Sequence, residues 1–355
     1  MSGWNQGGAG QGDRTLRILV DPRIELLTVV QLLADCCGPS GESVLTRLEM
    51  PYLRTVESRF GPWSGHPAVA RHRQMHQQGF WLGHPPHAML HLSEPPDLVV
   101  QPPIDAFVVG RAGGQKALED WIELLRRFAH DSSFVEFYRA EQPFYQAMVD
   151  RYQEVISGVN YVGELEAYYG RSQASYTIIL APLCHPGGFG PRIERGPGLC
   201  DVYNISGPLG VAPDGVPTFG DTAELRRIVW HEFGHSFVNH LVDRHLDTVM
   251  QPCSVLLSHM RARFEGMPGM SWGVFVHEWV SEHVVRAVTT RLAYRELGTE
   301  AGDSALQKEH GAGWPYVGEL AKELERYERN RTKYPSLEAF LPELLTVFRR
   351  VSSAC

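Results

Sequence analysis

The chain has 355 residues, of which 43% are hydrophobic, and a formal net charge of −8. A chain of this size can bury a large core, either as one domain or as two lobes. The negative charge and the lack of a Lys/Arg-rich run argue against a nucleic-acid partner. No apolar run approaches the roughly 20 residues that span a bilayer, so no membrane partner is expected either.

The N-terminal segment, residues 1–13, is rich in glycine. It lacks the basic segment and the following apolar segment of a signal peptide. We therefore expect a disordered tail, followed by one domain over residues 14–351, in a cytoplasmic protein. The cysteines show neither CxxC nor disulfide-framework spacing, which favours thiols. These cysteines are Cys36, Cys37, Cys184, Cys200, Cys253 and Cys355.

Hydrophobic periodicity predicts a mainly helical N-terminal part that extends to about residue 170. A short strand is expected first, over residues 15–21. A helix that ends near Gly38 should follow it. The predicted helices are 23–35, 43–60, 66–78 and, with breaks near Asp131 and at Pro143, most of the segment Gln115–Tyr169.

Two segments of β-branched and aromatic residues follow, "SYTIILAPL" and "CDVYNIS", within residues 175–206. A loop rich in Gly and Pro joins them, and we expect the pair to be antiparallel strands. From Thr222 to residue 351 the pattern is helical again. The predicted fold class is α+β, mainly helical, with a small sheet beside a cleft.

The motif His231-Glu232-Phe233-Gly234-His235 carries the strongest chemical signal. Two histidines four residues apart on a helix project from one face, so both imidazoles can bind one zinc ion. Glu232 then lies beside the open coordination position, where it can take a proton from a zinc-bound water. The motif therefore predicts a zinc-dependent hydrolase.

The residues around the motif support a helix. Asp221 and Thr222 offer an N-cap, and an apolar stripe follows them. Gly234 costs about 1 kcal/mol relative to Ala in a helix interior. We therefore expect a packing reason for Gly234, such as the close approach of another backbone.

A catalytic zinc ion normally has three protein ligands, so one more ligand is needed. The longer metzincin pattern is excluded, because Leu241 stands where its third histidine would be. The later apolar helix "SWGVFVHEWVSEHVVRAVTTRLAYREL" carries Glu278 and Glu282 on one face. Buried charges need a partner, and zinc would supply one. A thermolysin-like order would make Glu278 the ligand, but spacing alone does not choose between the two.

Six segments between about Leu16 and Phe348 carry a family resemblance. They are "VDPRIELLTVVQLLAD", "RFGPWSGHPAV", "YTIILAPLCHPGGFG", "HEFGHSFVN", "SEHVVRAVTTRL" and "YERNRTKYPSLEAFLPEL". With these segments the chain resembles an uncharacterised bacterial gluzincin-like family of zincins, a domain of unknown function. The resemblance implies a zincin-like metallopeptidase domain with an edge strand that binds substrate. It favours Glu282 as the third ligand, with Glu278 as the alternative.

Peptide hydrolysis also needs a hydrogen-bond donor that stabilises the oxyanion. Tyr316 is the first candidate because its segment is family-like, and His277, His310 and Tyr203 are alternatives. Asn239 is expected to cap or brace the zinc helix, with no contact to substrate. A series of N-terminal histidines has irregular spacing and no accompanying cysteine, so it predicts no second metal site. These histidines are His66, His72, His76, His84, His87 and His91.

The sequence thus predicts a gluzincin-type metallopeptidase that acts on a peptide or protein substrate. His231, His235 and Glu282 are expected to bind Zn²⁺, with Glu232 as the general base. Two alternatives remain open. One is a non-catalytic zincin-like domain that binds a partner. The other is a metallohydrolase of a non-peptide amide or ester, because activation of water is common to both reactions.

Overall fold

The structure is a computed structural model that describes residues 16–36, 43–101, 104–196, 198–261 and 271–353. The expected Gly-rich tail lies outside these ranges. The described part is mainly helical with small sheets, which confirms the α+β class. None of its helices combines the length and the apolar character that crossing a bilayer requires.

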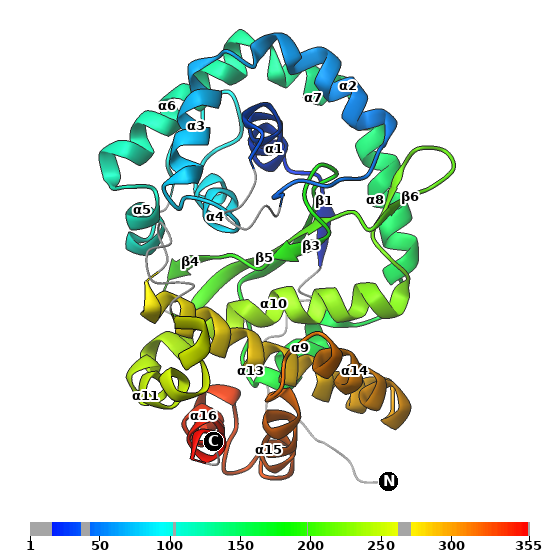
Figure 1. The fold of residues 1–355 in the computed structure, drawn as a ribbon. Helices are drawn as coiled ribbons and strands as arrows, with labels where there is room; N and C mark the ends of the chain where they lie inside the picture. The colour runs from blue at the N-terminus through cyan, green and yellow to red at the C-terminus, as the bar shows by residue number, and fades with distance from the viewer. Residues whose placement is uncertain (1–15, 37–42, 102–103, 197, 262–270, 354–355) are drawn as a thin grey trace.

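The N-terminal part is helical, as predicted. Figure 1 shows several of its helices in an arc around α1. Proline at the expected break, Pro143, lies in the first turn of a helix, where its missing N–H has no intrahelical acceptor. The helices are α1 (Pro22–Ala34), α2 (Pro51–Phe60), α3 (Pro67–Gln77), α4 (His84–Leu90), α5 (Ala106–Arg111), α6 (Gln115–Asp131), α7 (Phe134–Ala140), α8 (Gln142–Ile156) and α9 (Tyr161–Tyr169).

The helix predicted over residues 43–60 is shorter than expected, because only its second half forms α2. Met50 is extended, with φ −147° and ψ 154°. A residue that precedes proline is disfavoured in the α region by clashes with the proline ring. Upstream, Leu45 forms a β-bridge with Cys184. This segment therefore joins the N-terminal part to the sheet.

The main sheet lies between the N-terminal and C-terminal helices (Figure 1). Its strand order is β1-β2-β5-β3, and β4 also pairs with β5. Strands β1, β2 and β5 are parallel, whereas β3 and β4 run antiparallel to β5. The strands are β1 (Arg17–Leu19), β2 (Ser175–Leu180), β3 (Gly187–Phe189), β4 (Arg192–Gly196) and β5 (Leu199–Gly207).

The prediction that residues 175–183 and 200–206 form an antiparallel pair is wrong. Their strands, β2 and β5, are parallel, with Tyr176 opposite Val202. A parallel pair needs a connection of about a dozen residues or more, and the loop between these strands is long enough. That loop contains β3 and β4, which take the antiparallel positions beside β5. The loop thus supplies the edge of the sheet.

A two-stranded hairpin of β6 (Gly210–Val211) and β7 (Pro217–Thr218) leads into the C-terminal helices. Figure 1 shows α10 directly below the sheet and α13 beyond it. The helices are α10 (Thr222–Arg244), α11 (Leu246–Leu256), α13 (Trp272–Glu296), α14 (Thr299–Gly311), α15 (Val317–Arg329) and α16 (Leu337–Ser352).

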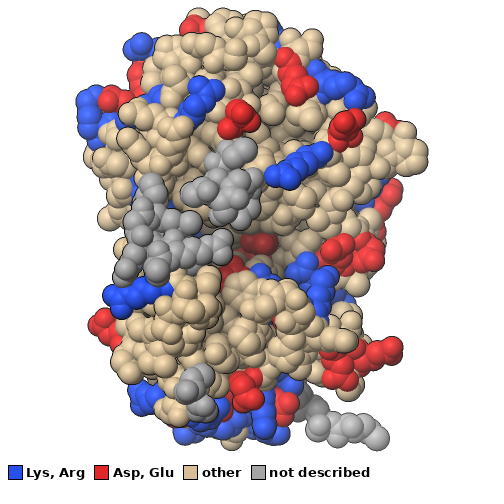
Figure 2. Space-filling view, in the orientation of Figure 1, with Lys and Arg blue, Asp and Glu red and all other residues tan. Residues whose placement is uncertain are grey.

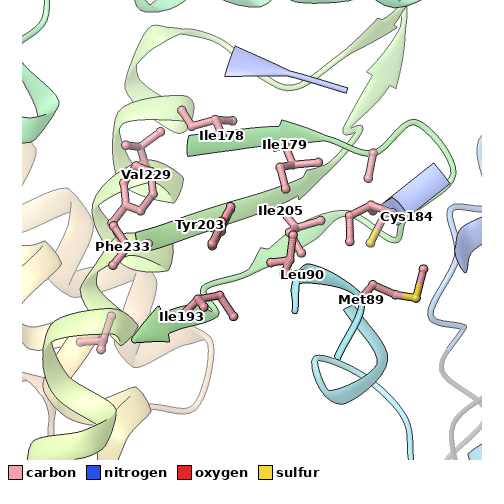
Figure 3. Close-up of a cluster of buried hydrophobic side chains, with 14 of the residues drawn as sticks. Met89, Leu90, Ile178, Ile179, Cys184, Ile193, Tyr203, Ile205, Val229 and Phe233 are labelled. Carbon is pink, nitrogen blue, oxygen red and sulfur yellow. The ribbon is translucent and has the colours of Figure 1, made fainter. Parts of the chain in front are cut away.

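Apolar side chains fix α10 against the sheet. Figure 3 shows Val229 and Phe233 of α10 beside the strands that carry Ile178 and Ile205. All four side chains are fully buried. The ring of Phe233 also meets Tyr176 of β2 edge to face, with centroids 5.3 Å apart. Helix α4 packs on the other side of the sheet (Figures 1 and 3). The sheet that supports α10 is therefore covered on both faces.

Candidate metal centre

Helix α10 presents two histidines from one face. Its first turn is capped as predicted, since the carboxylate of Asp221 accepts a hydrogen bond from Glu224 N at 2.9 Å. The Nε2 atoms of His231 and His235 lie 3.2 Å apart. Two nitrogens bound at about 2.0–2.1 Å to one tetrahedral ion lie roughly 3.3 Å apart. The two imidazoles are therefore spaced for a shared metal ion.

Helix α13 adds the carboxylate of Glu282. Its Oε1 lies 3.2 Å from Nε2 of His235, and its Oε2 lies 3.6 Å from Nε2 of His231. One donor atom from each residue lies within 4.8 Å of the others, so the three could hold one metal ion. Glu278 is placed differently: its side chain is 48% exposed and lies 3.9 Å from Nδ1 of His277. The structure thus brings Glu282, rather than Glu278, to the two histidines.

Gly234 allows α13 to approach α10 closely. A Cβ atom at this position would lie 2.9 Å from the hydroxyl oxygen of Tyr169 and 3.1 Å from Cγ1 of Val285. Cores at native density have no space for such an added atom. The expected packing reason for this glycine is therefore confirmed. Val285 lies one turn from Glu282, so the same close approach brings that carboxylate to the histidines.

Asn239 contacts the ring nitrogen of His235 that lies away from the other two donors. Its Oδ1 lies 3.0 Å from Nδ1 of His235, which leaves Nε2 directed at the other two donors. The carbonyl oxygen of Asn239 lies 3.0 Å from Nε2 of His277 on α13. Asn239 was expected to cap or brace the helix; its side chain contacts His235 of the same helix, and its carbonyl oxygen contacts α13. A hydrogen bond to the outer ring nitrogen fixes the orientation of a metal-binding histidine.

Glu282 belongs to a row of ionic contacts, Glu282–Arg286–Glu309, in which negative and positive side chains alternate. Arg286 donates from Nε to Oε2 of Glu282 at 2.9 Å and from Nη1 to Oε2 of Glu309 at 2.9 Å. The guanidinium carbon of Arg286 also lies 4.3 Å from the ring centroid of Trp314. These contacts limit the rotamers of Glu282. Glu309 is 6% exposed and was not expected from the sequence, because it lies on another helix, α14.

Glu232 lies against the glycine-rich edge of the sheet. A Cβ atom at Gly188 would lie 3.1 Å from Cδ of Glu232 and 2.8 Å from the carbonyl oxygen of Ile205, and one at Gly190 would overlap the carbonyl oxygen of Glu232. Both positions therefore require glycine. Both glycines are visible in the sequence "HPGGFG". The reason for them becomes clear only when β3 is placed next to Glu232.

Burial and charge set the protonation of the ionisable side chains at the centre. Burial lowers the pKa of His231 to about 3 and raises the pKa of Glu232 to about 7. Burial also disfavours protonation of His235, but the charge and hydrogen bond of Glu282 outweigh it and raise its pKa to about 9. Burial opposes ionisation of Glu282, yet the two histidines and Arg286 hold its pKa far below the usual range. His231 is therefore available as a neutral donor and Glu282 as a carboxylate, whereas His235 would release a proton on binding a metal ion.

A hollow crosses one face of the molecule. Figure 2 shows this hollow between the upper, N-terminal helices and the lower, C-terminal helices, with acidic and basic side chains inside it. In the same orientation, Figure 1 places β5 and α10 at this height. The side chains of His231, His235 and Glu282 are 10%, 12% and 26% exposed, so the donor group is not sealed from solvent.

The expected oxyanion donors have other described contacts. Tyr316 packs against rings on α13, with centroids 5.8 Å from Trp279 and 5.9 Å from His283. His277 faces the backbone of α10. Tyr203 is 5% exposed on β5, and burial raises its pKa. His310 lies in the last turn of α14. The role of Tyr316 in catalysis stays a prediction.

Fold and site together define a mainly helical α+β protein with a candidate metal centre of two histidines and one glutamate. The chain belongs to the family described as "Domain of unknown function (DUF4932)", which matches residues 16–347. The match covers nearly the whole chain, so the expected resemblance to a family of unknown function is confirmed. No curated protein and no solved structure gives a match.

Proposed function

We propose that this protein is a zinc-dependent metallopeptidase of gluzincin type, with a zincin-like arrangement of α10, α13 and the sheet edge. The observation that carries the proposal is the group formed by His231, His235 and Glu282, with Glu232 next to the first histidine. Two imidazoles and one carboxylate are the protein ligands of catalytic zinc sites that keep one position open. A structural zinc site would instead be closed by a fourth protein ligand.

The donor set fits zinc by its chemistry. Nitrogen and carboxylate donors suit Zn²⁺, and the outer contacts from Asn239 and Arg286 orient the donors as such a site requires. When bound there, the ion would polarise the scissile carbonyl and lower the pKa of a water molecule to about 7. The protein side chains would transfer the protons and position the substrate.

Glu232 moves the proton in this proposal. Its carboxylate accepts a proton from the attacking water and later donates it to the amide nitrogen of the leaving amine. Its backbone lies against Gly190 and its side chain against Gly188. These contacts hold the carboxylate at the side of the metal centre that faces the sheet edge.

Strand β3 is proposed to bind the substrate backbone. Among the described strands, it pairs only with β5, so its other edge has no strand partner. An extended peptide can add to such an edge through main-chain hydrogen bonds. Because β3 contains Gly188, which contacts Glu232, a peptide there would pass close to the proposed general base. This proximity favours a peptide over other substrates.

The test compares Glu232→Gln with wild type in metal content and peptide cleavage. A peptide library is digested and the products are identified by mass spectrometry. We expect the variant to bind as much zinc as wild type and to lose at least about 100-fold in rate, because general-base catalysis contributes that much. The matched control is Glu278→Gln, since that carboxylate is half exposed and outside the donor group.

Each other result has a defined meaning. Cleavage by Glu232→Gln at the wild-type rate contradicts the assigned general base. Wild-type protein that hydrolyses esters or small amides but no peptide supports the alternative metallohydrolase. Wild-type protein that binds zinc through His231 and His235 but hydrolyses none of these substrates supports a binding domain. Failure of zinc to bind these residues at all removes the enzyme proposal.

A further inference from the structure

A second group of metal-binding side chains lies in the N-terminal part. His72 and His76 are one turn apart on α3, and Cys36 follows the end of α1. One donor atom from each lies within 4.8 Å of the others. The three residues are 0%, 6% and 3% exposed, respectively. Unlike the centre on α10, this group is buried at every position.

His72 has an unsatisfied side chain. Both of its ring nitrogens are buried, and neither has a hydrogen-bond partner among the described residues. Its ring lies beside the indole of Trp121, with centroids 5.9 Å apart. Burying an imidazole without a partner costs free energy, so native structures seldom leave one in this state. A metal ion would satisfy the nitrogen that faces Cys36 and His76.

The backbone brings Cys36 to α3 by contacts that do not depend on a metal. Asp35 adopts the left-handed conformation, with φ 51° and ψ 53°, and turns the chain back at the end of α1. Arg73, between the two histidines, donates from Nε to Ala34 O at 2.8 Å and from Nη2 to Leu33 O at 3.2 Å. The end of α1 and the face of α3 are thus fixed beside each other.

We propose that Cys36, His72 and His76 form a second metal site, that its ion is Zn²⁺, and that it ties α1 to α3. A thiolate with two imidazoles is a donor set that favours zinc over magnesium or calcium, which prefer oxygen. Because the group is completely buried, its ion would tie the two helices together and would not meet a substrate; the described residues supply three of the four protein ligands that such a site usually has. This proposal does not depend on the proposed peptidase function.

Another histidine group is less suited to hold an ion. His87, His91 and Asp105 also have donor atoms within 4.8 Å of one another. However, Asp105 is 46% exposed, and its carboxylate already caps α5 by accepting from Val108 N at 2.8 Å. Nε2 of His87 also lies 3.1 Å from the carbonyl oxygen of Arg192. His87 and Asp105 are thus engaged in hydrogen bonds, and the carboxylate is exposed to water.

The test uses cobalt as a probe. The full chain is stripped of metal and refilled with Co²⁺, which takes the place of zinc and absorbs light. A thiolate ligand gives an intense sulfur-to-cobalt charge-transfer band in the near ultraviolet, whereas the His231, His235 and Glu282 centre contains no sulfur. We expect this band in wild type at about one equivalent per chain. A spectrum with only the weak ligand-field bands of nitrogen and oxygen donors would overturn the proposal.

Matched variants assign the ligand. Cys36→Ser should abolish the band and lower zinc content by one equivalent, whereas Cys253→Ser, at another fully buried cysteine, should change neither. His72→Ala should weaken the band as well, and provides a second test if Cys36→Ser does not fold. His235→Ala should remove one equivalent of zinc but keep the band. A band that survives in Cys36→Ser would exclude Cys36 as a ligand.

Discussion

Oδ1 of Asn239 lies 3.0 Å from Nδ1 of His235, while Nε2 of the same ring faces His231 and Glu282. We predict that Asn239→Ala weakens zinc binding by about 10–100-fold, the usual effect of losing such a partner. Competition with a coloured chelator would measure this change. Asn330→Ala is a control, because the described hydrogen bond of the Asn330 side chain goes to the carbonyl oxygen of Arg326 in its own helix, away from the metal centre. Equal zinc affinity in both variants would exclude the orienting role.

Arg286 links Glu282 to the buried Glu309. Arg286→Met should lower the free energy of unfolding by about 1–3 kcal/mol, because it leaves Glu309 buried without its charged partner. The double variant Arg286→Met/Glu309→Gln should recover part of this loss. Urea denaturation in the presence of a chelator would measure both without a contribution from bound metal. A double variant less stable than Arg286→Met would contradict the pairing.

Gly234→Ala tests the close approach of α10 and α13. The added Cβ would meet the hydroxyl of Tyr169 and the side chain of Val285. We expect a loss of about 1–3 kcal/mol in the free energy of unfolding, together with weaker zinc binding, because overpacking displaces the helices. Gly311→Ala is the control, since nothing lies within 4 Å of its added Cβ. That control should be neutral or slightly stabilising.

Glu25 gives a prediction about pH. It is 1% exposed on α1, and burial raises its pKa to about 7, although the hydroxyl of Tyr52 donates to its Oε2 at 2.5 Å. Between the ordinary pKa of 4.5 and about pH 7, the folded state holds a proton that the unfolded state has lost. Stability from this group is therefore complete below pH 4.5 and falls as pH rises to about 7.

The fall should amount to about 3 kcal/mol at most, from the size of the shift. Glu25→Gln carries no titrating proton, so the wild type should lose stability relative to this variant between pH 5 and pH 8. Urea denaturation of both proteins at these two values would measure the difference. A constant difference between the two proteins would show that Glu25 ionises normally in the folded state.

The sequence predicted features that depend on neighbouring residues. Asp221 begins α10 because its side chain can reach the N–H of Glu224. The helical periodicity of the N-terminal and C-terminal parts likewise depends on residues three and four positions apart. The packing of Gly234 was also predictable, since a glycine inside a helix needs a reason.

Features that depend on contacts between segments distant in the sequence could not be predicted from neighbouring residues. The direction of β5 relative to β2 depends on the loop, and that loop itself forms β3 and β4. Cys36 lies far from His72 in the sequence, so the irregular histidine series gave no sign of their proximity. For the same reason, Glu309 could not be connected with Glu282 before α14 was placed.

The charged side chains around the candidate metal centre bear on which ions it could hold. Glu309, Glu282 and an ionised Glu232 carry three negative charges, and Arg286 and the nearby Arg227 carry two positive charges, a sum of −1. The neutral histidines that metal binding requires leave that sum unchanged. A trivalent ion would therefore leave a larger buried net charge than a divalent ion, and buried charge is costly. We expect the centre to bind ferric iron more weakly than ferrous iron or zinc.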